Sequence, residues 1–267
     1  MRALALAALS LSVSSTAHAA GPTVELGDLT TSELRTRLVS CPVALIYNGG
    51  MDETGPHVAL AKHNLRAQHY GTEIAERLGN ALLAPIIPYA PNPKPSSDLP
   101  GEIALRPATY VAINEDVARS LIDGGFRRVV ILAEHGMGLD DLNALANRLD
   151  GEFSGRNIRV FYISDVYALA RKEIEQEIKA SGQVAGGHGG LWDTSETMAS
   201  DPSAVRPDEF AFGTSDQDGN GPPNEAGFSG DPRQSSVALG RRFGEKRITL
   251  AVAEIRRDLG VAGPCRR

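Results

Sequence analysis

The sequence has little of the residue types on which several protein classes depend. Cysteine occurs only twice among 267 residues, at Cys41 and Cys265, which excludes a zinc site built mainly on cysteine. Basic residues are outnumbered by acidic ones: 27 lysines and arginines against 33 aspartates and glutamates give a formal net charge of −6. Because nucleic-acid binding needs a basic surface, we expect no nucleic-acid partner.

Long apolar runs are also missing, apart from one at the start of the chain. Residues Ala3–Val13 are mainly apolar, follow the charged Met1-Arg2 and precede the small-residue pattern Ala17-His18-Ala19. This arrangement is typical of a secretory signal peptide that is cleaved after Ala19. A membrane anchor is the alternative, but the run is shorter than the ~20 residues that span a bilayer.

The rest of the chain is predicted to be one exported domain. We expect a signal peptide over residues 1–19 and a single α/β domain over residues 20–267, in a periplasmic or secreted protein that does not contact the membrane after cleavage. In such an oxidising compartment Cys41 and Cys265 can form a disulfide or remain separate thiols. The sequence leaves both alternatives open.

Apolar runs and helix-like patterns alternate along this domain. Buried strands are predicted at Pro42–Tyr47, Ala81–Ile87, Arg128–Ala133 and Ile158–Ile163. Apolar residues at helical spacing predict helices over residues 64–78, 109–123, 139–149, 166–180, 194–200 and 235–259. The alternation predicts βαβ units, and therefore an α/β fold of three layers with a mainly parallel sheet flanked by helices. Residues 182–233 are rich in glycine, proline, aspartate and serine and are expected to be irregular.

Histidine is scarce and clustered. Four of the six histidines, His57, His63, His135 and His188, fall in three short segments that also carry glycines and acidic residues. Two of these segments follow predicted strands directly. Since ligands bind at the carboxyl ends of strands in open α/β sheets, the clustering predicts a functional site there.

Side chains of these segments match the ligands of a divalent metal. Asp52, His63, His135 and Asp193 offer two carboxylates and two imidazoles, a set that suits zinc or manganese. A metal held by them would lower the pKa of bound water and polarise a substrate carbonyl. The remaining two histidines of the cluster are candidates for proton transfer near neutral pH.

Structural roles explain several of the same residues individually. Asp52 can be a turn residue, His63 together with Asn64 can cap the following helix, and Asp193 can cap the short helix after it. His135 has no comparable alternative, because it directly follows an apolar strand. The sequence has no serine-centred nucleophile elbow and no phosphate-binding glycine loop, which argues against an α/β-hydrolase triad and a nucleotide site.

Together, the segments resemble the creatininase family (creatinine amidohydrolases and relatives). Asp52–His63 resembles the family motif Glu-Gln-His-Gly-Pro-His-Leu-Pro-Leu-Gly-Thr-Asp, and Ala133–Gly138 resembles Asn-Gly-His-Gly-Gly-Asn. His188–Ser195 is similar to the family's His-Ala-Gly and Glu-Thr-Ser, with shorter matches at Pro100–Glu102 and Gly230–Pro232. These collinear matches imply the family's fold and a metal-dependent hydrolase, and they suggest a homo-oligomer.

The resemblance also implies a changed metal site. In the family, the positions of Asp52, His63 and His135 hold one metal of a pair, whereas the second metal needs a histidine where this chain has Thr54. A neutral His63 cannot bridge two metals as the family's aspartate does. We therefore expect one divalent metal per chain, zinc or manganese, with Asp193 at the position of a family glutamate as a further ligand.

The expected reaction is hydrolysis of a cyclic amide or related carbonyl compound, a small molecule, by a metal-activated water. In this reading His188 donates a proton to the leaving group and His57 polarises the site, while Glu53 and Glu134 serve as substitute ligands or a general base. Two alternatives remain open: a lactone or keto-sugar ring hydrolase, and a non-catalytic periplasmic protein that binds a metal or small ligand.

Overall fold

The computed structural model describes residues 23–92, 98–215, 221–263 and 265. The predicted signal peptide, residues 1–19, lies outside them. In the part that is described, no helix combines the length and the apolar character needed to cross a membrane.

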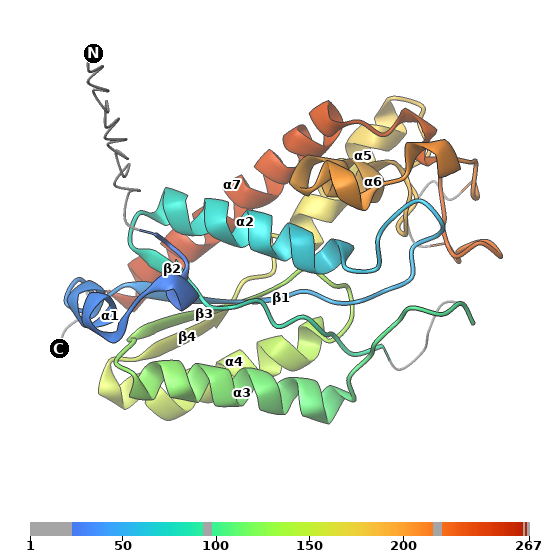
Figure 1. Ribbon diagram of the computed structural model, residues 1–267. Helices are drawn as coiled ribbons and strands as arrows, with labels where there is room; N and C mark the ends of the chain where they lie inside the picture. Colours follow the sequence, from blue (N-terminus) through green and yellow to red (C-terminus); the bar gives the residue numbers. More distant parts are fainter. Residues whose placement is uncertain (1–22, 93–97, 216–220, 264, 266–267) are drawn as a thin grey trace, which may run out of the picture.

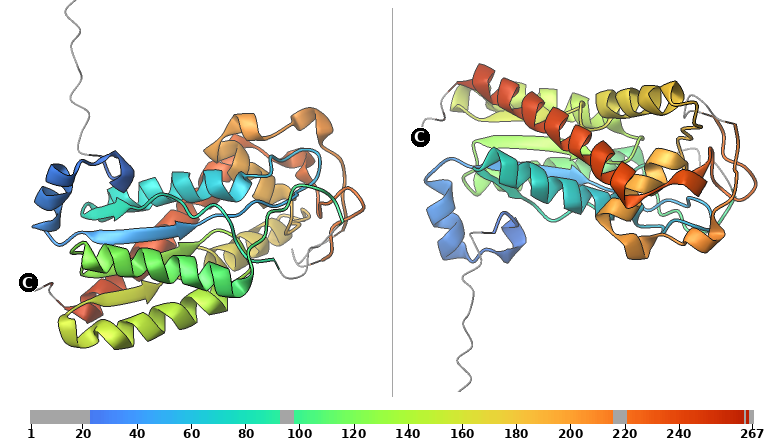
Figure 2. Two further views of the ribbon diagram at one scale, coloured as in Figure 1. Left: turned by 60° about the horizontal axis from the view of Figure 1, so that its bottom comes forward. Right: turned by 90° about the horizontal axis from the view of Figure 1, so that it is seen from above.

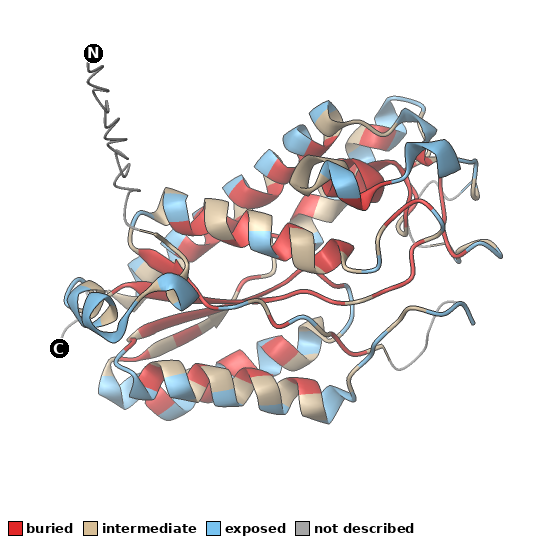
Figure 3. Ribbon diagram, in the orientation of Figure 1, coloured by how far each residue is buried: buried red, intermediate tan, exposed pale blue. Residues whose placement is uncertain are grey.

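A four-stranded parallel sheet forms the centre of the molecule (Figure 1). Its strands are β1 (Val43–Asn48), β2 (Ala81–Leu83), β3 (Arg128–Ala133) and β4 (Arg159–Tyr162), in the spatial order β2-β1-β3-β4. Every residue of β1 and β3 is buried, and Figure 3 shows the central strands in the buried colour along their length. Such strands are typical of a parallel sheet that is covered on both faces.

Helices cover both faces of the sheet and give the molecule three layers (Figures 1 and 2). One face carries α2 (Lys62–Leu78), α5 (Ala168–Ala180), α6 (Leu191–Ser200) and α7 (Val237–Ala262), and the other carries α3 (Pro107–Asp123) and α4 (Leu139–Phe153). The remaining elements are α1 (Thr31–Leu38) and the short 3₁₀ turns Leu26–Asp28, Ser154–Arg156, Pro202–Ala204, Pro207–Glu209 and Pro232–Gln234. The predicted three-layer α/β fold is confirmed.

Alternate residues of the central strands reach opposite helix layers. Leu45 and Tyr47 of β1 pack in the apolar cluster that includes α2 and α7, whereas Ala44 and Ile46 pack in the cluster that includes α3 and α4. Since side chains of a strand alternate between its two faces, one short apolar run supplies both cores.

Several elements differ from the predicted ones, in their bounds or in their presence, and two of these differences have a clear physical reason. β2 ends at Leu83 instead of Ile87, because Pro85 has no N–H to donate to a neighbouring strand. α1 was not predicted, although Thr30 and Glu33 form a capping box at its start, each side chain accepting a hydrogen bond from the other residue's backbone.

A disulfide lies at the amino-terminal end of the sheet. Cys41 and Cys265 are bonded, with their Cα atoms 6.4 Å apart and 224 residues between them in sequence. The bond joins the segment that leads into β1 to the chain that follows α7. Of the two alternatives that the sequence left open, the structure has the disulfide.

The strand order places a crevice at the opposite, carboxyl-terminal end of the sheet. From β1 the chain passes to β2 on one side and then returns to β3 on the other side of β1. Asn48 at the end of β1 pairs with Ala133 at the end of β3, so the loops that follow the two strands leave from the same edge. Ligands of open α/β sheets bind at such a switch point.

Candidate active site

A cavity of about 200 Å³ opens at the carboxyl ends of β1 and β3. The polar residues that line it come from the loop after β1, the start of α2, the segment after β2, the loop after β3, and α6 with the segment leading into it: Asp52, Lys62, His63, Asn92, His135, His188 and Asp193. Met137, Tyr167, Arg171 and Trp192 form much of the remaining wall. The three segments that the sequence singled out therefore meet in one cavity.

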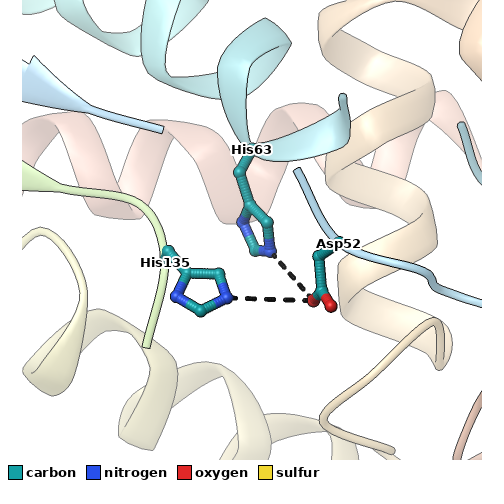
Figure 4. Close-up of side chains that lie close together, drawn as sticks. All are labelled: Asp52, His63 and His135. Atoms are coloured by element: carbon teal, nitrogen blue, oxygen red, sulfur yellow. Dashed lines mark ion pairs between the residues drawn. The ribbon is translucent and has the colours of Figure 1, made fainter. Parts of the chain in front are cut away.

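Asp52, His63 and His135 converge on one another inside this cavity (Figure 4). The Nε2 atom of His63 lies 3.6 Å from Asp52 Oδ2, and Nε2 of His135 lies 3.9 Å from the same oxygen. All three side chains are nearly buried, with at most 10% of the side chain exposed. His63 lies in the first turn of α2 and makes no N-terminal cap, so the capping alternative does not apply to it.

The other ring nitrogen of each of these histidines accepts a hydrogen bond. Nη2 of Arg66 lies 3.2 Å from Nδ1 of His63, and the backbone N–H of Met137 donates to Nδ1 of His135 over 3.2 Å. A guanidinium and a peptide N–H can only donate, so both Nδ1 atoms are unprotonated. The single proton of each neutral ring is then on Nε2, facing Asp52.

His188 faces the same carboxylate with its unprotonated ring nitrogen, whereas His63 and His135 face it with a protonated one. Its Nε2–H donates to the backbone carbonyl of Glu53, and its Nδ1 lies 3.6 Å from Asp52 Oδ2. The loop before α6 reaches this position because Gly186 has a φ of 62°, and a Cβ there would lie 2.3 Å from the carbonyl oxygen of Ser229.

Asp193 is enclosed by cations. Its Oδ2 lies 2.5 Å from Nζ of Lys62 and accepts the backbone N–H of Gly189 over 2.8 Å, while its Oδ1 lies 2.5 Å from Nη1 of Arg66. Both cations are almost completely buried. Burial alone would raise the pKa of Asp193, but the charges of Lys62 and Arg66 hold it well below its usual range. Asp193 thus balances two buried cations and also binds the backbone ahead of α6.

Glu134 lies behind the cavity and does not line it. Its Oε1 is 3.0 Å from Nε of Arg66, and Oη of Tyr47 donates to its Oε2 over 3.3 Å. Burial raises the pKa of Glu134, and the nearby charges of Arg247 and Arg66 oppose that rise. Glu196 continues this buried network, because its two oxygens contact the same two arginines.

His57 also lies outside the cavity lining. Its Nε2–H donates to the backbone carbonyl of Gly189 over 2.8 Å, and its ring packs edge-on against Phe228 and Phe210. His57 therefore links the loop after β1 to the glycine-rich loop that carries His188. Thr54, where the resembled family has a metal-binding histidine, is completely buried.

Burial makes the imidazoles around Asp52 neutral at ordinary pH. It lowers the pKa of His135 to about 4 and that of His63 well below its usual range, and the charge of Lys62 acts in the same direction on both. For Asp52, burial would raise the pKa, but the polar contact with His63 and the charge of Lys62 outweigh it and bring the pKa below its ordinary value. An ionised carboxylate thus faces three neutral rings.

Comparison with known proteins gives the family. The family model Creatininase, described as creatinine amidohydrolase, matches residues 27–255. The chain belongs to the creatininase family. Its structural neighbours in this family are metal-dependent amidohydrolases. A search of curated protein sequences gives no match.

Solved creatininase structures share the fold at low sequence identity. A structure described as "Creatininase Mn" has 22% identity and a TM-score of 0.72 and covers 89% of this chain and 99% of its own. A creatininase mutant of "Zn-Zn type" has 21% identity and a TM-score of 0.74, with 89% and 99% covered. A putative creatinine amidohydrolase from Bacteroides fragilis NCTC 9343 has 20% identity and a TM-score of 0.68, with 88% and 96% covered.

In this creatininase-family chain, two groups of described residues can hold a divalent metal. The first is Asp52 with His63 and His135, and the second is Asp52 with Glu53 and His188. Within each group, one potential ligand atom per residue lies within 4.8 Å of the others. Carboxylate and imidazole ligands fit zinc and manganese, the metals named for the two neighbours above. Asp193 belongs to neither group.

Among the residues of this region that sequence reasoning missed are Lys62 and Arg66, the two cations that neutralise Asp193. They lie four positions apart in α2, so one face of the helix presents both cations to Asp193. Two basic residues at this spacing on the buried face of a helix could have indicated an internal acidic partner. Nothing in the sequence, however, shows that the partner is Asp193, which follows Arg66 by 127 residues.

Proposed function

We propose that this protein is a metal-dependent amidohydrolase that opens a cyclic amide or a related carbonyl compound with a metal-activated water. One observation carries the proposal: a buried, ionised Asp52 faces three neutral imidazoles in a small cavity at the switch point of the sheet. Family membership supports the reaction class. A cavity of about 200 Å³ suits a substrate of few atoms.

A divalent metal bound beside Asp52 would activate a water molecule and polarise the substrate carbonyl. The residues around it divide the remaining tasks. Asp52 supplies the negative charge that attracts the metal, and the neutral rings of His63, His135 and His188 are available as ligands or for proton transfer. Glu53 supports His188 through its carbonyl and contributes a carboxylate to the second group.

Three predicted residues receive supporting roles in this proposal. His57 positions the glycine-rich loop through the Gly189 carbonyl, and Glu134 and Asp193 compensate buried cations. None of the three needs to contact a substrate for the site to work. Their hydrogen bonds instead fix the segments that carry Asp52 and His188.

We also propose that the protein is exported, as a single domain after removal of its signal peptide. The Cys41–Cys265 disulfide supports this, because disulfides persist mainly in oxidising compartments. Microscopy or fractionation of cells that express the full chain, compared with a chain that lacks residues 1–19, tests the location. Retention of the full chain in the cytoplasm would contradict it.

Hydrolysis assays test the activity. The protein is loaded with zinc or manganese, or treated with a chelator, and assayed against a panel of cyclic amides and lactones. We expect metal-dependent opening of at least one cyclic amide, and loss of that activity in Asp52→Asn. Opening of lactones alone would favour the lactone hydrolase, and saturable metal binding without hydrolysis of any ring would favour the non-catalytic binding protein.

A further inference from the structure

The hydrogen-bond polarity of the three histidines around Asp52 distinguishes between the two groups that can hold a metal. A neutral imidazole has one protonated and one unprotonated nitrogen, and only the unprotonated one can bind a metal. In metal sites the other ring nitrogen almost always donates its proton to a carbonyl, a carboxylate or water. The partner on the far side of each ring therefore shows which nitrogen is available for a metal.

For His63 and His135 the far-side partners are donors. Arg66 donates to Nδ1 of His63 and the Met137 amide donates to Nδ1 of His135, each over 3.2 Å. The nitrogen that each ring turns toward Asp52 is therefore the protonated Nε2, at 3.6 and 3.9 Å. A metal on Nε2 would require the proton to move to Nδ1, where it would point at another N–H.

Arg66 cannot easily turn away to relieve that conflict. Its guanidinium is completely buried and is held at the same time by Glu134, Asp193 and Glu196, at 3.0, 2.5 and 3.3 Å. The three contacts use Nε and Nη1, so Nη2 stays directed at His63. The ion network thereby fixes the proton of His63 on the side of the cavity.

For His188 the far-side partner is an acceptor. Nε2–H donates to the carbonyl of Glu53, which leaves the lone pair of Nδ1 directed at the cavity, 3.6 Å from Asp52 Oδ2. This is the arrangement that metal-binding histidines have. Glu53 both orients the ring through its backbone and places its own carboxylate in the same group as Asp52.

We propose that His188, through Nδ1, binds the divalent metal together with Asp52 and Glu53, and that His63 and His135 act as N–H donors beside it. The proposal rests on the proposed function in one respect, that a divalent metal binds next to Asp52. In this arrangement the two Nε2–H groups are free to donate to Asp52 or to an oxygen that becomes negative on the substrate.

The test is zinc binding by three variants that carry the same substitution in the full exported chain: His63→Gln, His135→Gln and His188→Gln. Glutamine keeps an N–H group near the position of Nε2 but is a poor zinc ligand. His69→Gln is the matched control, because His69 lies in α2 next to Tyr70 and does not line the cavity. Circular dichroism checks that each variant is folded.

We expect His188→Gln to weaken zinc binding by more than about 100-fold, and His63→Gln and His135→Gln to weaken it less, by about 10–100-fold at most, as for residues that support a ligand. Zinc affinity of His69→Gln should equal that of the parent. Loss of binding in His63→Gln or His135→Gln as large as in His188→Gln would overturn the assignment.

Nitrogen NMR of the histidine rings gives an independent readout. Before zinc is added, His63 and His135 should each show a protonated Nε2, and these N–H signals should persist when zinc saturates the site. The zinc-induced shift should instead appear at Nδ1 of His188. Disappearance of either Nε2–H signal on zinc addition would overturn the assignment alone, whereas absence of saturable zinc or manganese binding to the parent would contradict the proposed function as well.

Discussion

Two clusters of buried and partly buried polar side chains lie next to each other at the carboxyl-terminal edge of the sheet. The site cluster consists of Asp52, His63, His135 and His188, and the ion network consists of Lys62, Arg66, Glu134, Asp193, Glu196 and Arg247. In the ion network every charge meets an opposite charge at 3.3 Å or less. In the site cluster the carboxylate of Asp52 faces neutral imidazole rings across a cavity.

The comparison shows that residue type and burial do not separate a functional group from a structural one. Asp52 and Asp193 are both aspartates with at most 5% exposure, and both line the cavity. They differ in their partners: Lys62 and Arg66 neutralise Asp193, whereas Asp52 faces imidazole nitrogens. Because an isolated buried charge is costly, Asp52 is the carboxylate that gains most from a bound cation.

The largest expected effect comes from breaking the ion network away from the cavity. Arg247→Met removes the guanidinium that contacts Glu196 at 2.6 Å and leaves a buried carboxylate without that partner. We expect the free energy of unfolding, measured in urea, to fall by about 3–5 kcal/mol. The control is Arg77→Met, which breaks the exposed pair with Glu245 and should cost less than about 1 kcal/mol. Equal losses in the two variants would contradict the distinction.

The disulfide at the other end of the sheet should affect stability without affecting the site. Replacing Cys41 and Cys265 together by serine is expected to lower the free energy of unfolding by about 2–5 kcal/mol, because the bond closes a very long loop of the unfolded chain. Zinc affinity should not change, since the bond and the cavity lie at opposite ends of the strands. A reductant should lower the free energy of unfolding of the parent to that of the variant. It should not change the free energy of unfolding of the variant.

At acid pH, protonation of His135 should destabilise the metal-free protein. Burial lowers its pKa to about 4 in the folded chain, against about 6.5 when unfolded, so the unfolded chain binds more protons between these values. This contribution reduces stability as the pH falls from 6.5 to 4, by about 2–3 kcal/mol. Urea unfolding of chelator-treated His135→Gln should show a shallower fall over this range. If the free energy of unfolding fell equally with pH in the parent and the variant, the prediction would be contradicted.

The smallest effect is expected at Thr54. Among the described residues, its buried hydroxyl has no hydrogen-bond partner. Thr54→Val should therefore change the free energy of unfolding by less than about 1 kcal/mol, since no hydrogen bond is lost. Metal stoichiometry, measured by elemental analysis, should stay at one per chain. A drop in bound metal would show that Thr54 contributes to the site after all.

The sequence predicts the structure correctly where one strand and the loop that follows it determine the position of a residue. The apolar run of β3 has the bounds predicted for it, and Asp52, His63 and His135 converge because β1 and β3 end side by side. The position of Glu134 could have been predicted in the same way. Continuing the alternation of β3 puts it on the face of Val130 and Leu132, which pack against the α2 and α7 layer.

Other features depend on partners that are distant in sequence. The sequence around Asp193 does not show which residues it contacts. The two cations that neutralise it come from α2, 127 and 131 residues earlier. The ring nitrogen that His63 or His188 turns to the cavity depends on Arg66 and on the carbonyl of Glu53. Sequence can name a histidine as a candidate ligand, but the tautomer requires the folded surroundings.

Zinc binding to Asp52→Asn and Asp193→Asn, measured side by side by calorimetry, tests the central claim most directly. The two variants remove the same charge from the same cavity, but only Asp52 faces the imidazole nitrogens. We expect Asp52→Asn to lose measurable zinc binding, and Asp193→Asn, though less stable, to keep an affinity within about 100-fold of the parent, as for a residue that supports the site. Retention of zinc by Asp52→Asn together with its loss from Asp193→Asn would contradict the account.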